Sequence, residues 1–169
     1  MEMLEHLKAR GMDVSLYPYL GYDEIYATFP MYDFHGRMTG FMRYNPSGSK
    51  DGKNDLKNAK YYCYLPNKAV GVWGLESIDF SPTIYLVSGM FKAATLHRLG
   101  FTSLHVSNIP PKVLKAQLRL MCRPYIAIGD NDDEGRQFVR RHGGFTSPLD
   151  VDEMSDQDIL NMIKEKGGE

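Results

Sequence analysis

The chain has 169 residues, of which 43% are hydrophobic and 24% charged, and its net charge is −1. This composition excludes a globally disordered chain and suits one folded domain, or one core with a small appendage. The longest apolar runs, such as Ile84–Val87, are far too short to cross a bilayer, and the acidic N-terminal residues lack the apolar stretch of a secretory signal. We expect a cytoplasmic protein, in the host cytoplasm if it is viral, with no membrane partner.

The chain contains two cysteines, Cys63 and Cys122. They lie far apart and form no CxxC pair, so the sequence supports neither a disulfide scaffold nor a zinc ribbon. We therefore expect no zinc cofactor.

The small net charge hides two basic segments. Residues 37–68 hold seven Lys and Arg against two Asp and Glu, and residues 81–149 hold nine against four. Acidic ends offset them, with two basic against six acidic residues over 1–36 and two against seven over 150–169. Because a polyanion responds to the local field and not to the total, nucleic acid stays a candidate partner.

The first half of the chain predicts a short helix followed by antiparallel strands. Apolar residues at helical spacing open the chain, and β-favouring aromatics later flank a glycine turn. In chain order we expect a helix over Met1–Arg10, strands over Tyr26–Phe34 and Arg37–Tyr44 joined at His35-Gly36, a polar loop over Asn45–Asn58, and a Tyr-rich strand over Lys60–Leu65.

The second half alternates short apolar runs with helical patterns, which indicates βαβ units and a parallel sheet. We expect strands over Ile84–Val87, Ser103–Val106 and Tyr125–Ile128, helices over Gly89–Leu99, Pro110–Met121 and Asp133–Arg141, and a last helix capped by Ser155 that runs to about Lys166. The predicted fold class is α/β.

Two aspartates, Asp130 and Asp132, follow the third predicted parallel strand at the sheet edge where ligands bind. If the strand geometry continues, both point to one side, and two carboxylates there suit a hard divalent ion such as Mg²⁺ or Mn²⁺. Two alternatives stay open. The acidic residues can form a solvated helix N-terminus, or an Asp-x-Asp of the haloacid-dehalogenase type, although that pattern usually continues with Thr and here Asp133 follows.

Taken together, segments of this chain resemble the catalytic core of bacterial- and phage-type DNA primases, whose C-terminal half is a Toprim domain. The similarity runs from about Gly21 to Asp152. The segment Phe29–Tyr44 resembles the family's "fPi.d..G.v.Gf..R", Lys60-Tyr61-Tyr62 its "KY", Val72–Leu75 its "lyGl", Tyr85–Gly89 and the next helix its first Toprim motif "vvEGy.D", Asp130–Arg136 its second, "DgD.aGr", and Asp150–Asp152 its "DpD".

The resemblance implies an N-terminal primase-core-like α+β subdomain over residues 1–78, a Toprim-like, Rossmann-like parallel-sheet domain over 79–149, and an acidic C-terminal helix over 150–169. It also implies that Asp130 and Asp132 hold metal around an incoming nucleoside triphosphate. Arg43, close to the family's arginine, Lys60 of the "KY" match and Arg136 of the second motif are then expected to hold template and phosphates.

The first motif departs from the family, because Ser88 stands where its Glu belongs and Lys92 where its Asp belongs. Ser88, Lys92, Asp130 and Asp132 together carry a formal charge of −1, so we expect at most one Mg²⁺ or Mn²⁺. In one interpretation the site is degenerate. In the other, one metal survives and Lys92 is a catalytic cation, with Glu134 or Glu76 supplying a carboxylate. Lys92 can also be an ordinary solvent-facing lysine, and Ser88 a helix cap.

Three functions follow from the resemblance. The first is Mg²⁺-dependent RNA primer synthesis from nucleoside triphosphates on single-stranded DNA, as in phage replication. The second is a nucleic-acid-binding or accessory replication subunit without catalysis, and the third a small Toprim nuclease. Because no cysteine quartet is present, a helicase or a zinc-binding primase subunit would have to come from another chain.

Overall fold

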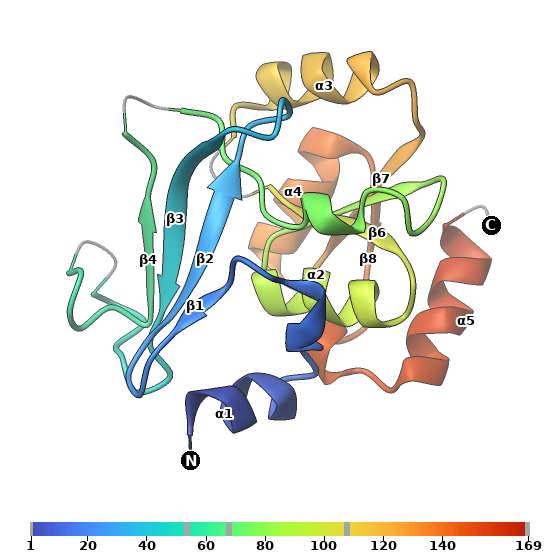
Figure 1. Ribbon diagram of the computed structural model, residues 1–169. Coiled ribbons are helices and arrows are strands. Elements are labelled where there is room, and N and C mark those ends of the chain that lie inside the picture. The colour runs from blue at the N-terminus through green and yellow to red at the C-terminus, as the bar shows by residue number, and fades with distance from the viewer. Residues whose placement is uncertain (1, 53–54, 67–68, 107–108, 168–169) are drawn as a thin grey trace. The chain divides into compact units, whose positions relative to one another are not determined.

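The computed structural model describes residues 2–52, 55–66, 69–106 and 109–167 (Figure 1). The chain divides into two compact units, residues 1–73 and residues 74–169, and each is described separately below. The domain division predicted at residues 78 and 149 stays a prediction. No helix within the described ranges is long and apolar enough to span a membrane.

The first unit is built on an antiparallel sheet of four strands in the order β1-β2-β3-β4. The predicted glycine turn is confirmed: Gly36 has a φ of 77°, and the Asp33 carboxylate accepts hydrogen bonds from the His35 and Arg37 amides on either side of it. The elements are α1 (Met3–Ala9), the 3-10 turn η1 (Val14–Leu16), β1 (Gly21–Tyr22), β2 (Ala27–Tyr32), β3 (Met38–Tyr44) and β4 (Tyr61–Tyr64).

One face of this sheet forms the core of the first unit. Alternate residues of β2 and β3, such as Phe29 and Tyr44, are buried, as the period of two in a strand requires. Trp73 is 1% exposed and closes this core, with its ring centroid 4.8 Å from that of Tyr17 and 5.5 Å from that of Phe29. The opposite face carries the half-exposed residues of the same strands.

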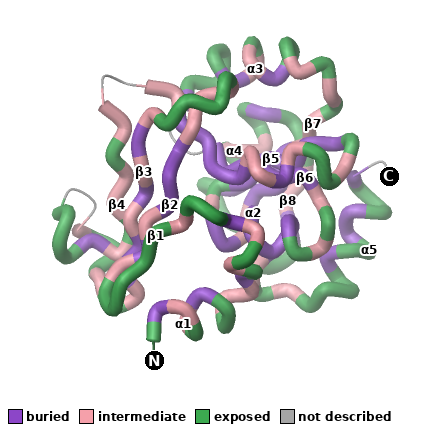
Figure 2. Tube along the Cα trace, in the orientation of Figure 1, coloured by how far each residue is buried: buried purple, intermediate pink, exposed green. Residues whose placement is uncertain are grey.

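The second unit is a parallel sheet in the order β6-β5-β7-β8, which confirms the predicted α/β class. Its central strand β5 is buried along its whole length (Figure 2). The elements are η3 (Leu75–Ser77), β5 (Ile84–Val87), α2 (Met90–Arg98), β6 (Thr102–His105), α3 (Pro111–Leu120), β7 (Tyr125–Gly129), α4 (Asp133–His142), β8 (Gly144–Thr146), η4 (Val151–Glu153) and α5 (Asp156–Lys166).

The strand order determines where the helices lie. The chain moves from β5 to β6 on one side, then crosses back past β5 to β7 and on to β8. Right-handed crossovers therefore place α2 on one face of the sheet and α3 with α4 on the other. The contacts agree, since α3 packs on α4 while α2 packs on β6 and η4.

Sequence analysis missed two short strands. The strand β8 has three residues and begins with Gly144, whose Cβ, if present, would lie 1.9 Å from the carbonyl oxygen of Ala127 on β7. The strand β1 has only Gly21 and Tyr22 and is exposed. Neither has an apolar period that the sequence could show, and close backbone pairing at Gly144 accounts for β8. The strand predicted over Ser103–Val106 is shifted by one residue, to Thr102–His105.

Replacing Trp73 by Ala should lower the free energy of unfolding of the first unit by about 3–5 kcal/mol, because it empties the space between Tyr17 and Phe29. Urea denaturation followed by circular dichroism measures this loss. Tyr19→Ala is the matched control, since that ring is 73% exposed, and it should change the free energy by less than about 0.5 kcal/mol. Equal effects of the two substitutions would contradict the assigned core.

Candidate functional site

The carboxyl ends of three neighbouring parallel strands supply the residues of the candidate site. Ser88 follows β5, Asp130 follows β7, and Asp150 lies four residues after the end of β8. Because β5, β7 and β8 are adjacent in the sheet, their ends meet at one edge. This is the edge at which open parallel sheets bind ligands.

Lys92, in the first turn of α2, joins two of these strand ends. Its ammonium Nζ donates a hydrogen bond to Asp130 Oδ2 and lies 3.8 Å from Asp150 Oδ1. The Lys92 side chain is only 11% exposed, and the Asp130 side chain 19%, so the alternative of a solvent-facing lysine is wrong. We call Lys92, Asp130 and Asp150 the lysine cluster.

Burial shapes the electrostatics around this cluster. It raises the pKa of the Asp150 carboxyl, while the Lys92 charge lowers that pKa and the charge of Asp130 raises it further. His105, at the end of β6, is buried, and its pKa is lowered to about 4 by burial first and by the Lys92 charge second. At neutral pH the imidazole is therefore uncharged, and Lys92 brings the positive charge to the two carboxylates.

Asp132 has a different partner from Asp130. It is the N-cap of α4, and its Oδ1 accepts a hydrogen bond of 2.6 Å from the Gly135 amide. Asp132 thus stabilises the start of α4 as a helix cap. A metal ion shared by Asp130 and Asp132 stays a prediction.

Glycines allow α4 to start so close to the end of β7. A Cβ on Gly135 would lie 2.1 Å from the Asp130 carbonyl oxygen, and a Cβ on Gly129 would lie 2.3 Å from the Gly135 carbonyl oxygen. These contacts leave no space for a side chain at either position. The two glycines therefore fix the backbone that carries Asp130 and Asp132.

The remaining predicted residues of this unit lie elsewhere on it. Arg136 pairs with Asp133 one turn away, at 2.7 Å, and Glu134 is exposed in the first turn of α4. Glu76 lies in η3, which packs on β6. Its Oε2 is buried without a hydrogen-bond partner among the described residues, and burial raises its pKa. Ser88 precedes Gly89, which is the N-cap of α2 and has no side-chain cap.

In the first unit, Arg43 and Lys60 lie on the sheet. The Arg43 guanidinium stands 4.6 Å from the centroid of the Tyr26 ring, a cation–π contact. Lys60 directly precedes β4 and is half-buried. Burial, followed by the charges of Arg10 and Lys60, lowers the pKa of His6 in α1.

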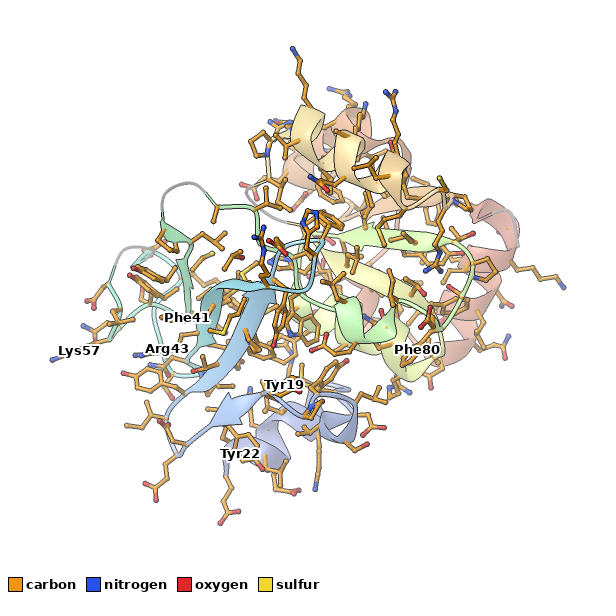
Figure 3. All side chains as sticks on the ribbon, turned by 45° about the horizontal axis from the view of Figure 1, so that its top comes forward. Tyr19, Tyr22, Phe41, Arg43, Lys57 and Phe80 are labelled. Atoms are coloured by element: carbon orange, nitrogen blue, oxygen red, sulfur yellow. The ribbon has the colours of Figure 1, made fainter. Side chains whose placement is uncertain are left out.

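Three half-exposed rings stand beside Arg43, a group that sequence analysis missed. Cross-strand pairing puts Tyr62 opposite Arg43 and Tyr64 opposite Phe41 on one face of the sheet. The Phe41 ring centroid lies 5.4 Å from that of Tyr64 and 6.4 Å from that of Tyr62. Figure 3 shows Phe41 and Arg43 near each other on β3. We call Phe41, Tyr62 and Tyr64 the aromatic row.

The Mg²⁺ expected from the resemblance can be tested against these residues. Within residues 2–52, 55–66, 69–106 and 109–167, no group of three or more His, Cys, Asp and Glu is arranged to hold a metal ion. Asp130 is ion-paired with Lys92, and Asp132 caps a helix. The number of metal ions at this edge of the sheet stays a prediction.

Comparisons with known proteins bear on the fold. No family model and no curated protein matches the sequence. Among solved structures, a DnaG primase catalytic domain bound to ssDNA has a TM-score of 0.61 at 16% identity, covering 95% of this chain and 64% of that one. The fold is that of a primase catalytic core. The predicted resemblance is confirmed at the level of fold, which is all that such identities show.

Two further structures agree. The zinc-binding and RNA polymerase domains of Aquifex aeolicus primase have a TM-score of 0.67 at 17% identity, covering 97% of this chain and 55% of that one. The primase fragment of the bacteriophage T7 primase-helicase protein has a TM-score of 0.64 at 18% identity, covering 93% of this chain and 73% of that one. This chain thus spans 64% of the ssDNA-bound DnaG domain and 55% of the Aquifex aeolicus structure.

The buried histidines predict acid-sensitive stability. His97, whose Nε2 donates to the Ser103 carbonyl, and His105 both have pKa values lowered to about 4, chiefly by burial. An unfolded histidine has a pKa near about 6.5 and binds protons first, so stability should be constant above that pH and fall as the pH drops from about 6.5 to 4. The slope should approach about 1.4 kcal/mol per pH unit for each histidine.

Urea unfolding at a series of pH values measures this slope. Replacement of His35 by Gln is the control, because that ring is exposed and its loss should leave the profile unchanged. A stability that stays constant between neutral pH and pH about 5 would contradict the assignment of neutral, buried imidazoles.

Proposed function

We propose that this chain is a primase-like protein that binds single-stranded nucleic acid without polymerising it. The nucleic-acid strand would lie on the first unit, along the aromatic row and Arg43. The observation that carries the proposal is that face of the sheet, where three half-exposed rings adjoin a guanidinium on a primase-type fold.

The chemistry of the aromatic row favours a single strand. Unpaired bases stack on aromatic side chains, whereas the base faces of a duplex are already covered by their neighbours. Arg43 supplies a cation for the phosphates, and residues 37–68 carry an excess of five positive charges, from seven basic and two acidic residues. The solved DnaG primase domain bound to ssDNA, which has the same fold, lends support by analogy.

The carboxyl edge of the second unit favours binding over polymerisation. The lysine cluster already pairs Asp130 with a cation, and Ser88 supplies no carboxylate. Nucleotidyl transfer on Mg²⁺ requires acids that are available to the metal. Primer synthesis from nucleoside triphosphates stays the second candidate, because the fold itself favours it. A helicase or zinc-binding subunit on another chain stays a prediction.

Fluorescence anisotropy with labelled single-stranded DNA tests the binding face. Phe41→Ala and Tyr64→Ala should each weaken binding by about fivefold to a hundredfold, because each removes a stacking partner. Arg43→Ala should also reduce the dependence of binding on salt, since it removes a phosphate contact.

Tyr19→Ala is the matched control for this experiment, because that exposed ring lies in the same unit but outside the aromatic row. It should leave the affinity unchanged. Equal affinity for single strands and duplex, or full binding by the Phe41 and Tyr64 variants, would refute the proposed face.

A priming assay separates binding from catalysis. The wild-type chain, incubated with single-stranded DNA, nucleoside triphosphates and Mg²⁺, should make no RNA, because Asp130 is paired with Lys92. If the wild-type chain makes primers and Asp130→Ala makes none, the chain is a polymerase instead. Scission of the DNA strand without triphosphates would establish the nuclease. Synthesis gained only after Ser88→Glu with Lys92→Asp would indicate a lapsed polymerase.

A further inference from the structure

We infer that Lys92 is a built-in cation that competes with divalent metal ions for Asp130 and Asp150. The chain would thus neutralise the carboxyl edge of its parallel sheet with a tethered ammonium. The inference supports the non-polymerising part of the proposed function and is independent of the aromatic row.

The inference rests first on the path of the Lys92 side chain. Lys92 leaves the first turn of α2 and returns across Gly89, where a Cβ would lie only 3.3 Å from Lys92 Cδ. The lysine stem therefore passes close to the backbone of Gly89. With 11% of the side chain exposed, the ammonium is held at the sheet edge and not in bulk water.

The inference rests next on the two carboxylates that the Lys92 ammonium meets. Lys92 Nζ donates to Asp130 Oδ2 and lies 3.8 Å from Asp150 Oδ1, so one cation connects the chain after β7 with the chain after β8. A partly buried lysine is stable only when paired, and removing it leaves uncompensated carboxylates. Those carboxylates are oxygen ligands of the kind that divalent ions prefer.

The inference rests last on the sum of the charges in the lysine cluster. Asp130 and Asp150 alone have a charge of −2, which one divalent ion would neutralise. With Lys92 in place the cluster has a charge of −1, and a divalent ion beside the ammonium would meet strong repulsion at short range. His105 does not alter this balance, because its buried imidazole is neutral at pH 7. Asp132 is committed to the start of α4.

The test measures metal binding and not catalysis. Isothermal titration of the wild-type chain with Mn²⁺ or Mg²⁺ should give weak or no binding at the lysine cluster. Lys92→Met, which keeps most of the volume and removes the charge, should bind one Mn²⁺ at least about tenfold more tightly. Its melting temperature should rise with added Mn²⁺, while that of the wild type stays constant.

Two control variants sharpen the measurement. Lys112→Met removes an exposed lysine of α3 and should bind metal as the wild type does. Lys92→Arg keeps the positive charge and should also leave metal binding weak. If Lys92→Met does not fold, Lys92→Gln takes its place, and broadening of the Asp130 and Asp150 amide resonances by Mn²⁺ compares the wild type with Lys92→Gln.

The outcomes separate this inference from the proposed function. Wild-type metal affinity equal to that of Lys92→Met, or tight metal binding by Lys92→Arg, would overturn the inference. Anisotropy with single-stranded DNA in the presence of a chelator tests the aromatic row on its own. Loss of DNA binding in the row variants, together with tighter metal binding by Lys92→Met than by the wild type, would leave both statements standing. Loss of DNA binding in the row variants, together with equal metal affinities of the wild type and Lys92→Met, would remove only the tethered cation.

Discussion

The ion pair between Lys92 and Asp130 is the interaction on which the proposed chemistry of the second unit depends. It connects the first turn of α2, the helix that follows the central strand β5, with the chain after β7, and Asp150 extends it to the chain after β8. The ammonium is partly buried, and removing such a partner leaves an uncompensated carboxylate. In the proposed function, a single side chain from α2 limits the chemistry at this edge of the sheet.

The two units differ in how their charged and aromatic side chains are paired and exposed. At the carboxyl edge of its parallel sheet the second unit pairs Lys92 with Asp130, whereas the antiparallel sheet of the first unit leaves rings and a guanidinium half-exposed. A net charge of −1 hides this contrast, because acidic ends cancel the basic segments. For a chain of this kind the local field and the accessible ring faces are better guides to a partner than the total charge.

Much of the fold could be predicted, and less of the site. The apolar run Ile84–Val87, flanked by turn residues and followed by a helical pattern, is typical of a buried parallel strand, and the structure confirms it without a change of bounds. The strand β8 has no such signal, because glycine backbone pairing forms it. Without β8, the sequence gives no reason to bring Asp150 beside Lys92. The alternation of Phe41 and Arg43 with Tyr62 and Tyr64 was a usable signal for the aromatic row, but it needed the register of β3 with β4.

Local sequence determined the elements: the α/β alternation, the turn at Gly36 and the aspartates that follow β7 all come from periodicity and turn chemistry over a few residues. Only the tertiary structure decided which charge meets which. Lys92 and Asp130 are 38 positions apart in the chain, and Asp132, two positions from Asp130, caps a helix instead. The physical reason is that a strand or a turn is fixed by its own residues, whereas an ion pair between strand ends depends on the order and register of the strands in the sheet.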